Sequence, residues 1–153
     1  MDRIDFEILK RLRKNGRQSN KEIANALGIA PSTCLVRTEN LRGTEALRGT
    51  HADIAPKAVG AEIEAMISVH LRQHTREEVA SFRQHLMTLP EVVQLYHVAG
   101  STDFLVHLWA RDSSHLRELA IDQFTSRPEV ARIETGLIFE HTDNYELPNL
   151  KVK

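Results

Sequence analysis

The sequence predicts an α+β protein with a winged-type helix-turn-helix domain at residues 1–50, a hinge or linker at 51–60, and a ferredoxin-like βαββαβ domain at 61–153. Three observations lead to this prediction. Two short helices with their own capping residues meet at a glycine. Beyond residue 60, the apolar residues change from helical spacing to the alternation typical of strands. The charge also divides, because the first fifty residues hold ten Lys and Arg against six Asp and Glu, and the remainder holds ten against fifteen.

The first helix is predicted at about residues 2–15. Asp2 can cap its start and Gly16 can end it. Four apolar residues at helical spacing form its inward stripe. They are Ile4, Ile8, Leu9 and Leu12.

Two further helices, at about residues 20–27 and 31–42, form the helix-turn-helix. Ser19 and Glu22 have the spacing of a capping box at the start of the first of them. Gly28 supplies the left-handed residue that ends it. The second helix of such a pair is shaped to enter the major groove of DNA, so we interpret residues 31–42 as a recognition helix.

The outward positions of this helix are candidate base contacts, and two arginines near its end are candidate phosphate contacts. Arg37 could pair with guanine, and Asn40 could reach an adenine or a phosphate. The basic N-terminal part supplies the field that attracts a phosphate backbone. The alternative is that Arg37 pairs with Glu22 or on the Glu39 side of the domain. The candidate DNA-binding residues are Ser32, Thr33, Val36, Arg37, Asn40, Arg42 and Arg48.

Glycines and a proline interrupt regular structure between Gly43 and Gly60. We expect a wing-like or hinge strand near Leu47–Ile54, followed by a linker.

The C-terminal part predicts the order β-α-β-β-α-β. A second capping box, Thr75 with Glu78, begins its first helix, and a later helix is capped near Asp112 or Ser113. Two short sequences recur at offsets of 37 and 38 residues, which indicates two related halves. They are Val69-His70-Leu71 with Val106-His107-Leu108, and Pro90-Glu91-Val92 with Pro128-Glu129-Val130. The strands are expected at residues 63–71, 92–98, 104–110 and about 130–141.

With these motifs in place, the chain resembles the Lrp/AsnC family, the feast/famine transcriptional regulators, over essentially its whole length. The residues that carry the resemblance in the N-terminal part are Asp5, Leu9, Asn15-Gly16-Arg17, Ser19-Asn20, Ile23 to Ile29, Pro31, Cys34-Leu35, Arg37 and Leu41. In the C-terminal part they are Pro90-Glu91-Val92, Gly100-Ser101-Thr102-Asp103 and Glu134-Thr135.

Four positions depart from the family pattern. Ala30 stands where a capping serine is usual, at a cost of about 1 kcal/mol in helix stability. Thr38 replaces a branched apolar residue. Gly43 falls inside the last helical turn and Glu45 stands where the family has glycine, so the recognition helix is expected to end early.

The resemblance implies an effector domain that binds an amino acid or a related metabolite, and the turn Ala99–Asp103 is the candidate site. Glycine lets successive N–H groups point at one anion, such as the amino acid's carboxylate, and Asp103 is the nearest acceptor for its ammonium. The family suggests that a strand of the same or a neighbouring dimer closes the pocket. An ordinary hairpin turn is the alternative. The candidate effector-binding residues are His97, Gly100, Ser101, Thr102, Asp103, Thr135 and Gly136.

The resemblance also implies homodimers, packed through their sheets, that gather into tetramers or octamers. Five strand residues are available for the two faces of the sheet, and alternation alone does not assign them to one face or the other. They are Val69, Leu71, Val106, Leu108 and Trp109.

Two other function classes stay open. Tetrapyrrole decarboxylases resemble this architecture, and an oligomeric partner protein could retain it without reading DNA. No paired catalytic carboxylates, nucleophile with a base, or phosphate loop is legible, so we predict no catalytic residues and no cofactor. His70 and His74 do not share a predicted face, and we predict no metal site. The single cysteine, Cys34, and the lack of a long apolar run predict a cytoplasmic protein without a membrane partner.

Overall fold

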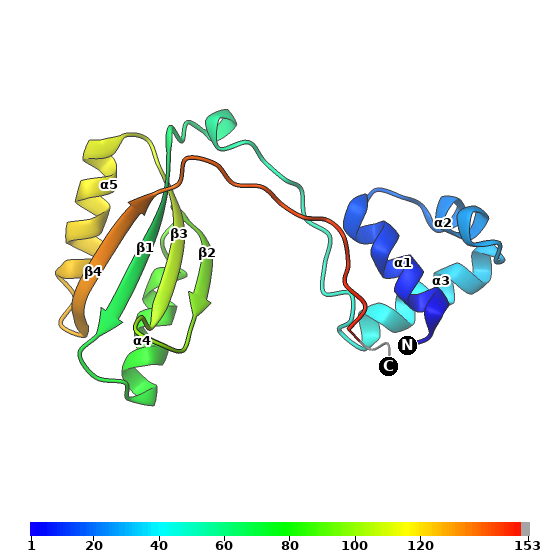
Figure 1. The fold of residues 1–153 in the computed structure, drawn as a ribbon, viewed down its shortest axis with the longest axis horizontal. Helices are drawn as coiled ribbons and strands as arrows, with labels where there is room; N and C mark the ends of the chain where they lie inside the picture. Colours follow the sequence, from blue (N-terminus) through cyan, green and yellow to red (C-terminus); the bar gives the residue numbers. More distant parts are fainter. Residues whose placement is uncertain (151–153) are drawn as a thin grey trace. The chain divides into compact units, whose positions relative to one another are not determined.

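The structure is a computed structural model and describes residues 1–150. Its contacts divide the chain into two compact units, which are described separately (Figure 1). One unit contains Met1–Asp53 together with the segment that begins at Thr142, and the other contains Ile54–His141. We expected a C-terminal domain over 61–153. The contacts group residues 142–150 with the helix-turn-helix.

Three helices form the N-terminal unit, as the sequence predicts: α1 (Arg3–Lys14), α2 (Asn20–Leu27) and α3 (Pro31–Gly43). Reciprocal capping boxes begin α1 and α2, where the side chains of Asp2 and Ser19 each accept a hydrogen bond from the backbone N–H three residues later. Gly28 ends α2 in the left-handed conformation, with φ of 67°.

Five fully or nearly buried residues form the core of this unit: Ile8, Ile23, Ala24, Cys34 and Leu41. Thr38 is 2% exposed and is the polar exception among its neighbours in α3. Its hydroxyl donates to the Cys34 carbonyl at 2.9 Å and lies 3.3 Å from the Asn20 side-chain oxygen. Because its polar atom is satisfied, the chain tolerates threonine at a position where an apolar residue was expected.

The predicted strand near Leu47–Ile54 is wrong, because the structure contains no strand there. A strand needs a neighbour with which to pair its backbone groups, and no second strand is described in this unit. The first residue of the segment, Leu47, instead donates its N–H to the carbonyl of Leu41 at 2.9 Å and packs against the helical core.

The returning C-terminal segment is held against α1 and the start of the linker. Arg13 donates to the Asn144 carbonyl at 2.8 Å, and Lys14 forms an ion pair with Glu146. The Tyr145 hydroxyl lies 3.5 Å from a carboxylate oxygen of Asp53. These contacts are why the segment belongs to the N-terminal unit.

The C-terminal unit confirms the predicted α+β class and the order β-α-β-β-α-β (Figure 1). Its four strands form an antiparallel sheet in the order β2-β3-β1-β4. The elements are a 3₁₀ turn at Pro56–Val59, β1 (Ile63–Leu71), α4 (Arg76–Leu86), β2 (Val92–His97), β3 (Phe104–Ala110), α5 (Ser113–Leu119), a π-helical turn at Ala120–Thr125, and β4 (Val130–Leu137).

Two details differ from the sequence-based expectation, and one alternative that the sequence left open is decided. The last strand ends at Leu137 rather than near His141, because its pairing with β1 ends where Leu137 lies opposite Ala65. The capping box of α4 is only half formed, since the Glu78 carboxylate accepts from the Thr75 hydroxyl instead of a backbone N–H. Asp112, the first of the two candidates, caps α5.

One face of the sheet is packed against the helices, and the opposite face is not covered by either helix. The register places the buried apolar residues of β1 and β3 on the packed face, whereas His107, which is 5% exposed, lies on the opposite face. Val69, Leu71, Val106 and Leu108 all lie on the packed face, whereas Trp109 pairs with Glu64 on the opposite face. The buried apolar residues of the two strands are Ala65, Ile67, Val69, Leu71, Phe104, Val106, Leu108 and Ala110.

Candidate functional site

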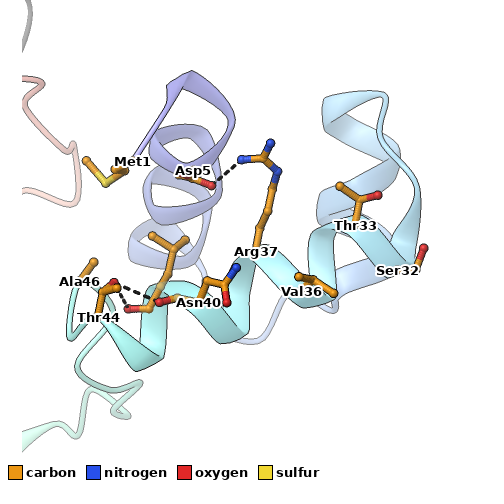
Figure 2. A pocket seen from close by; sticks show the side chains of 10 residues that line it. Met1, Asp5, Ser32, Thr33, Val36, Arg37, Asn40, Thr44 and Ala46 are labelled. Atoms are coloured by element: carbon orange, nitrogen blue, oxygen red, sulfur yellow. Dashed lines mark hydrogen bonds and ion pairs between the residues drawn. The ribbon is translucent and has the colours of Figure 1, made fainter.

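The outward residues of α3 gather on one exposed surface of the N-terminal unit (Figure 2). Val36 is 58% exposed, although it is apolar, and therefore takes no part in the core. With Met1 and Asp5 of the N-terminal segment, these residues line an open hollow of about 640 Å³. The members from α3 that we predicted as DNA contacts are Ser32, Thr33, Val36, Arg37 and Asn40.

Arg37 extends from α3 towards α1, where it forms an ion pair with Asp5 (Figure 2) and a second one with Asp2. Its Nη1 atom lies 2.8 Å from Asp2 Oδ2 and 2.7 Å from Asp5 Oδ1. Hydrogen bonds to Asp5 and then Asp2 raise the pKa of the Arg37 guanidinium. The sequence analysis gave an ion pair of Arg37 as the alternative to a DNA contact. An ion pair is present, but with Asp2 and Asp5 instead of Glu22 or the Glu39 side of the domain.

The other two arginines of the predicted DNA-binding set lie outside this hollow. Arg42 forms an i,i+3 ion pair with Glu39, with 3.0 Å between Nη1 and Oε1. Arg48 lies in the irregular segment after α3 and is exposed. The Arg42–Glu39 pair is largely in solvent, so it contributes little to stability.

The two ends of α3 carry the departures from the family pattern. Ala30 stands at the N-cap and makes no side-chain cap, as predicted. The helix does not end early, because it continues to Gly43, and the Thr44 hydroxyl then bonds to the Asn40 carbonyl at 3.0 Å. Glu45 follows in the left-handed region, with φ of 56°.

In the C-terminal unit, the predicted turn joins β2 to β3. Gly100 has φ of 128°, which favours glycine. Within the described residues, none of the backbone N–H groups of residues 99–102 donates a hydrogen bond. The Asp103 carboxylate accepts from the Leu71 N–H at 2.8 Å and lies 2.8 Å from His74 Nδ1. Asp103 therefore anchors the turn to the end of β1, a contact that the sequence did not predict.

The remaining candidate effector residues lie at other places in the sheet. His97 stacks on Phe104 with 4.8 Å between ring centroids. Thr135 pairs with Ile67 and Gly136 with Met66, whereas Asp103 of the turn contacts Val69 and Leu71 of the same strand. One protomer alone thus does not gather all seven residues into a single pocket.

Sequence reasoning missed two groups of contacts. The first is the pair Asp2 and Asp5 as partners of Arg37, which are 35 and 32 residues away from it. The second lies on the uncovered face of the sheet, where Glu64 Oε2 is 3.1 Å from His107 Nε2 and 3.3 Å from Trp109 Nε1. The repeated Val-His-Leu motif drew attention to His107 but gave no sign of its partners.

Comparison with known proteins identifies both parts of the chain. Residues 64–146 match the family model described as the Lrp/AsnC ligand binding domain, and residues 1–42 match a winged helix-turn-helix DNA-binding model. The HTH-type transcriptional regulator AldR of Mycolicibacterium smegmatis is 41% identical over 141 residues, which cover 92% of this chain and 82% of that protein.

The chain belongs to the Lrp/AsnC family.

Solved structures agree with this assignment. The crystal structure of the AldR protein MtbAldR has a TM-score of 0.77 at 32% identity and covers 97% of this chain and 100% of its own. A transcriptional regulator from Neisseria meningitidis, solved as a complex with L-Met, has a TM-score of 0.88 at 26% identity, with 97% and 96% covered.

This Lrp/AsnC protein is a DNA-binding transcriptional regulator with a small-molecule-sensing domain, and it is not an enzyme: its similar relatives are named as transcriptional regulators. Among its described residues, no group of three His, Cys, Asp or Glu side chains is arranged to hold a metal ion. None of the described helices is long and apolar enough to cross a membrane.

Proposed function

We propose that this regulator reads its operator through the exposed surface of α3 and uses Arg42 and Arg48 on the phosphate backbone. The observation that carries the proposal is the gathering of five candidate contacts on one solvent-facing surface next to an open hollow. None of these five side chains belongs to the core of the unit. Asn40, which is exposed, suits an adenine edge, and Val36 suits a thymine methyl group.

The test begins by selecting a high-affinity duplex from fragments of genomic DNA. Asn40→Ala should then weaken binding to that duplex by roughly 1–3 kcal/mol and relax the preference at one base pair. Arg48→Ala should weaken binding to every duplex and reduce the salt slope by about one. If the footprint and the affinity are unchanged in all three of the variants Asn40→Ala, Val36→Ala and Arg37→Ala, then α3 is not the element that reads DNA.

We also propose that the protein acts as a homodimer that can assemble further into a tetramer or octamer. A dimer would place two α3 helices on successive major grooves, about one helical turn or a small multiple apart. The uncovered face of the sheet supports this proposal, because Met66, Leu105 and Trp109 contribute to it and are only partly buried in one chain. Because it acts on the chromosome, we place its activity in the cytoplasm.

For the sensing domain, we propose that a free amino acid binds at the turn between β2 and β3. The unused N–H groups of residues 99–102 support a carboxylate site there. The L-Met complex of the Neisseria relative favours the same ligand class. Thr135 and Gly136 would join the pocket from a neighbouring dimer, since they lie away from the turn in their own chain.

Calorimetry with each of the twenty amino acids tests this site. Two variants separate the roles of Asp103: Asp103→Asn keeps an oxygen that can accept from Leu71 N–H but loses the charge, whereas Asp103→Ala loses both. If Asp103 contacts the ammonium, both variants weaken binding. If it only anchors the turn, Asp103→Asn binds like the wild type. No heat from any amino acid would remove the site.

A further inference from the structure

The contact between α1 and α3 divides four carboxylate oxygens between two tasks. Asp2 Oδ1 accepts from the backbone N–H of Asp5 at 3.0 Å, and Asp5 Oδ2 accepts from the N–H of Asp2 at 2.9 Å. This reciprocal pair caps α1. The other oxygen of each carboxylate accepts from Arg37 Nη1, at 2.8 and 2.7 Å. The same two aspartates therefore cap α1 and hold Arg37. We call their two contacts with Arg37 Nη1 the grip.

The grip uses only one nitrogen of the guanidinium. Arginine carries five N–H donors in a planar fork, and Nη1 holds two of them. Within the described residues, Arg37 Nε and Nη2 make no hydrogen bond. The Arg37 side chain is 31% exposed, so these donors are not sealed in the core. Arg37 and Asn40 line the same hollow, which Asp5 also lines.

We propose that Asp2 and Asp5 are positioning and specificity-determining residues for DNA recognition. By holding Nη1, they fix the plane of the Arg37 guanidinium and leave its Nε and Nη2 donors for a base edge or a phosphate. Their two negative charges also weaken the electrostatic attraction between Arg37 and a duplex with which it makes no specific contact. This inference rests on the proposed function, in which α3 reads DNA.

Two physical consequences follow from the grip. A preoriented planar fork loses less side-chain entropy when it forms a bidentate contact than a free arginine does. Removing an aspartate adds one positive charge to the surface, which strengthens binding to any sequence and increases its salt dependence. On the specific duplex the two effects oppose each other, whereas on random DNA only the added charge acts. The ratio of specific to random affinity therefore falls, and this ratio is the quantity to measure.

The structure offers variants that separate the grip from the cap. Asp2→Ser keeps an N-cap hydroxyl for the Asp5 N–H but loses the oxygen that contacts Arg37. Asp5→Asn removes the charge that faces Arg37, while Asp5→Glu keeps a charge and the usual third residue of a capping box. Asp112→Ser is the matched control. It also replaces an N-cap aspartate, whose side chain accepts from the His115 N–H at 2.8 Å, in the other unit of the chain.

The experiment measures binding of the full-length protein to the selected duplex and to a random duplex over a series of salt concentrations. For Asp2→Ser and Asp5→Asn, the ratio of specific to random affinity should fall about tenfold, and the salt slope on random DNA should steepen by about 0.9. Asp112→Ser and Asp5→Glu should keep the wild-type ratio. When Arg37 is already replaced by Ala, adding Asp2→Ser or Asp5→Asn should leave the ratio of specific to random affinity unchanged.

The outcomes separate this inference from the proposed function. If Asp2→Ser and Asp5→Asn keep the wild-type ratio, or lose it equally with and without Arg37, then the aspartates do not position the arginine and the inference fails. If Asn40→Ala, Val36→Ala and Arg37→Ala all leave specific binding unchanged, then α3 is not the reader and the proposed function fails. Thermal unfolding without DNA shows which variants remain folded, and Asp5→Asn decides the question should Asp2→Ser not fold.

Discussion

Glu45 is the one residue other than glycine that has a positive φ among the described residues, and it follows the end of the recognition helix. A side chain in the left-handed region costs roughly 1–2 kcal/mol, because its Cβ approaches the following carbonyl oxygen. Glu45→Gly should therefore raise the free energy of unfolding of the N-terminal unit by about 1 kcal/mol, as measured by urea denaturation.

Gly43 provides an independent comparison two residues earlier. It lies in the last turn of α3, and a Cβ added there would meet no atom within 4 Å. Gly43→Ala should raise stability by about 1 kcal/mol through helix propensity alone. If Glu45→Gly lowers stability while Gly43→Ala raises it, then the side chain of Glu45 makes a favourable contact that outweighs its strain.

Asp2 makes the N-terminal unit sensitive to acid. The backbone hydrogen bond from Asp5 and then the side-chain contact with Arg37 lower the pKa of Asp2 below its usual 3.8. A lowered pKa in the folded state contributes stability above the unfolded value, and this contribution is lost as the pH falls through the folded value. Asp2→Ser should therefore lose less stability than the wild type between about pH 6 and about pH 2.

Urea denaturation across this pH range checks the expectation. Glu22→Gln is a useful comparison, because hydrogen bonds from Ser19 lower the pKa of Glu22 without any contact to Arg37. If the free energy of unfolding falls equally with decreasing pH in the wild type and in Asp2→Ser, then other carboxylates control the loss of stability in acid.

At the scale of elements, the start of α3 is its weak end. Pro31 occupies the first turn, but Ala30 makes no side-chain hydrogen bond to the free N–H groups that follow it. The backbone of Ala30 already has the extended conformation that a capping residue needs. Ala30→Ser should thus raise the free energy of unfolding by about 1 kcal/mol.

Denaturation followed by circular dichroism measures this gain, with Ala26→Ser as a control inside α2. Serine at that exposed helical position should lower the free energy of unfolding by less than about 0.7 kcal/mol. A loss of stability in both variants would mean that the entry to α3 is constrained by contacts other than its cap.

At the scale of the whole molecule, the uncovered face of the sheet is expected to form the dimer. Leu105 lies on this face, opposite Ser68 of β1 and Tyr96 of β2. Leu105→Arg places a charge there, and burying an unpaired charge costs several kcal/mol. Light scattering at micromolar concentration should give the mass of a monomer for this variant and the mass of a dimer or a larger assembly for the wild type.

The control for this prediction changes charge on a helix rather than on the sheet. Glu118→Arg lies on an exposed position of α5 and should keep the wild-type mass. A wild-type protein that is monomeric at the same concentration, or a Leu105→Arg variant of unchanged mass, would contradict assembly through this face.

The sequence predicted the features that depend on near neighbours along the chain. Capping by Asp2 and Ser19, the left-handed Gly28 and the alternation in β1 all involve residues within a few positions of one another. The order β-α-β-β-α-β along the chain was also predictable, because each strand and helix has its own local periodicity and the two halves repeat short sequences. The predicted wing strand failed for the complementary reason: a strand near Leu47–Ile54 needs a partner, and local sequence does not supply one.

Only the tertiary structure decided which distant groups meet. Arg37 has the same outward place on α3 whether it is free or paired, and the fold of α1 against α3 brings Asp2 and Asp5 to it. The same is true of Asp103, whose carboxylate anchors a turn to Leu71. Hydrogen bonds and ion pairs act over a few ångströms, whereas chain spacing of thirty residues sets no distance, so packing alone determines these partners.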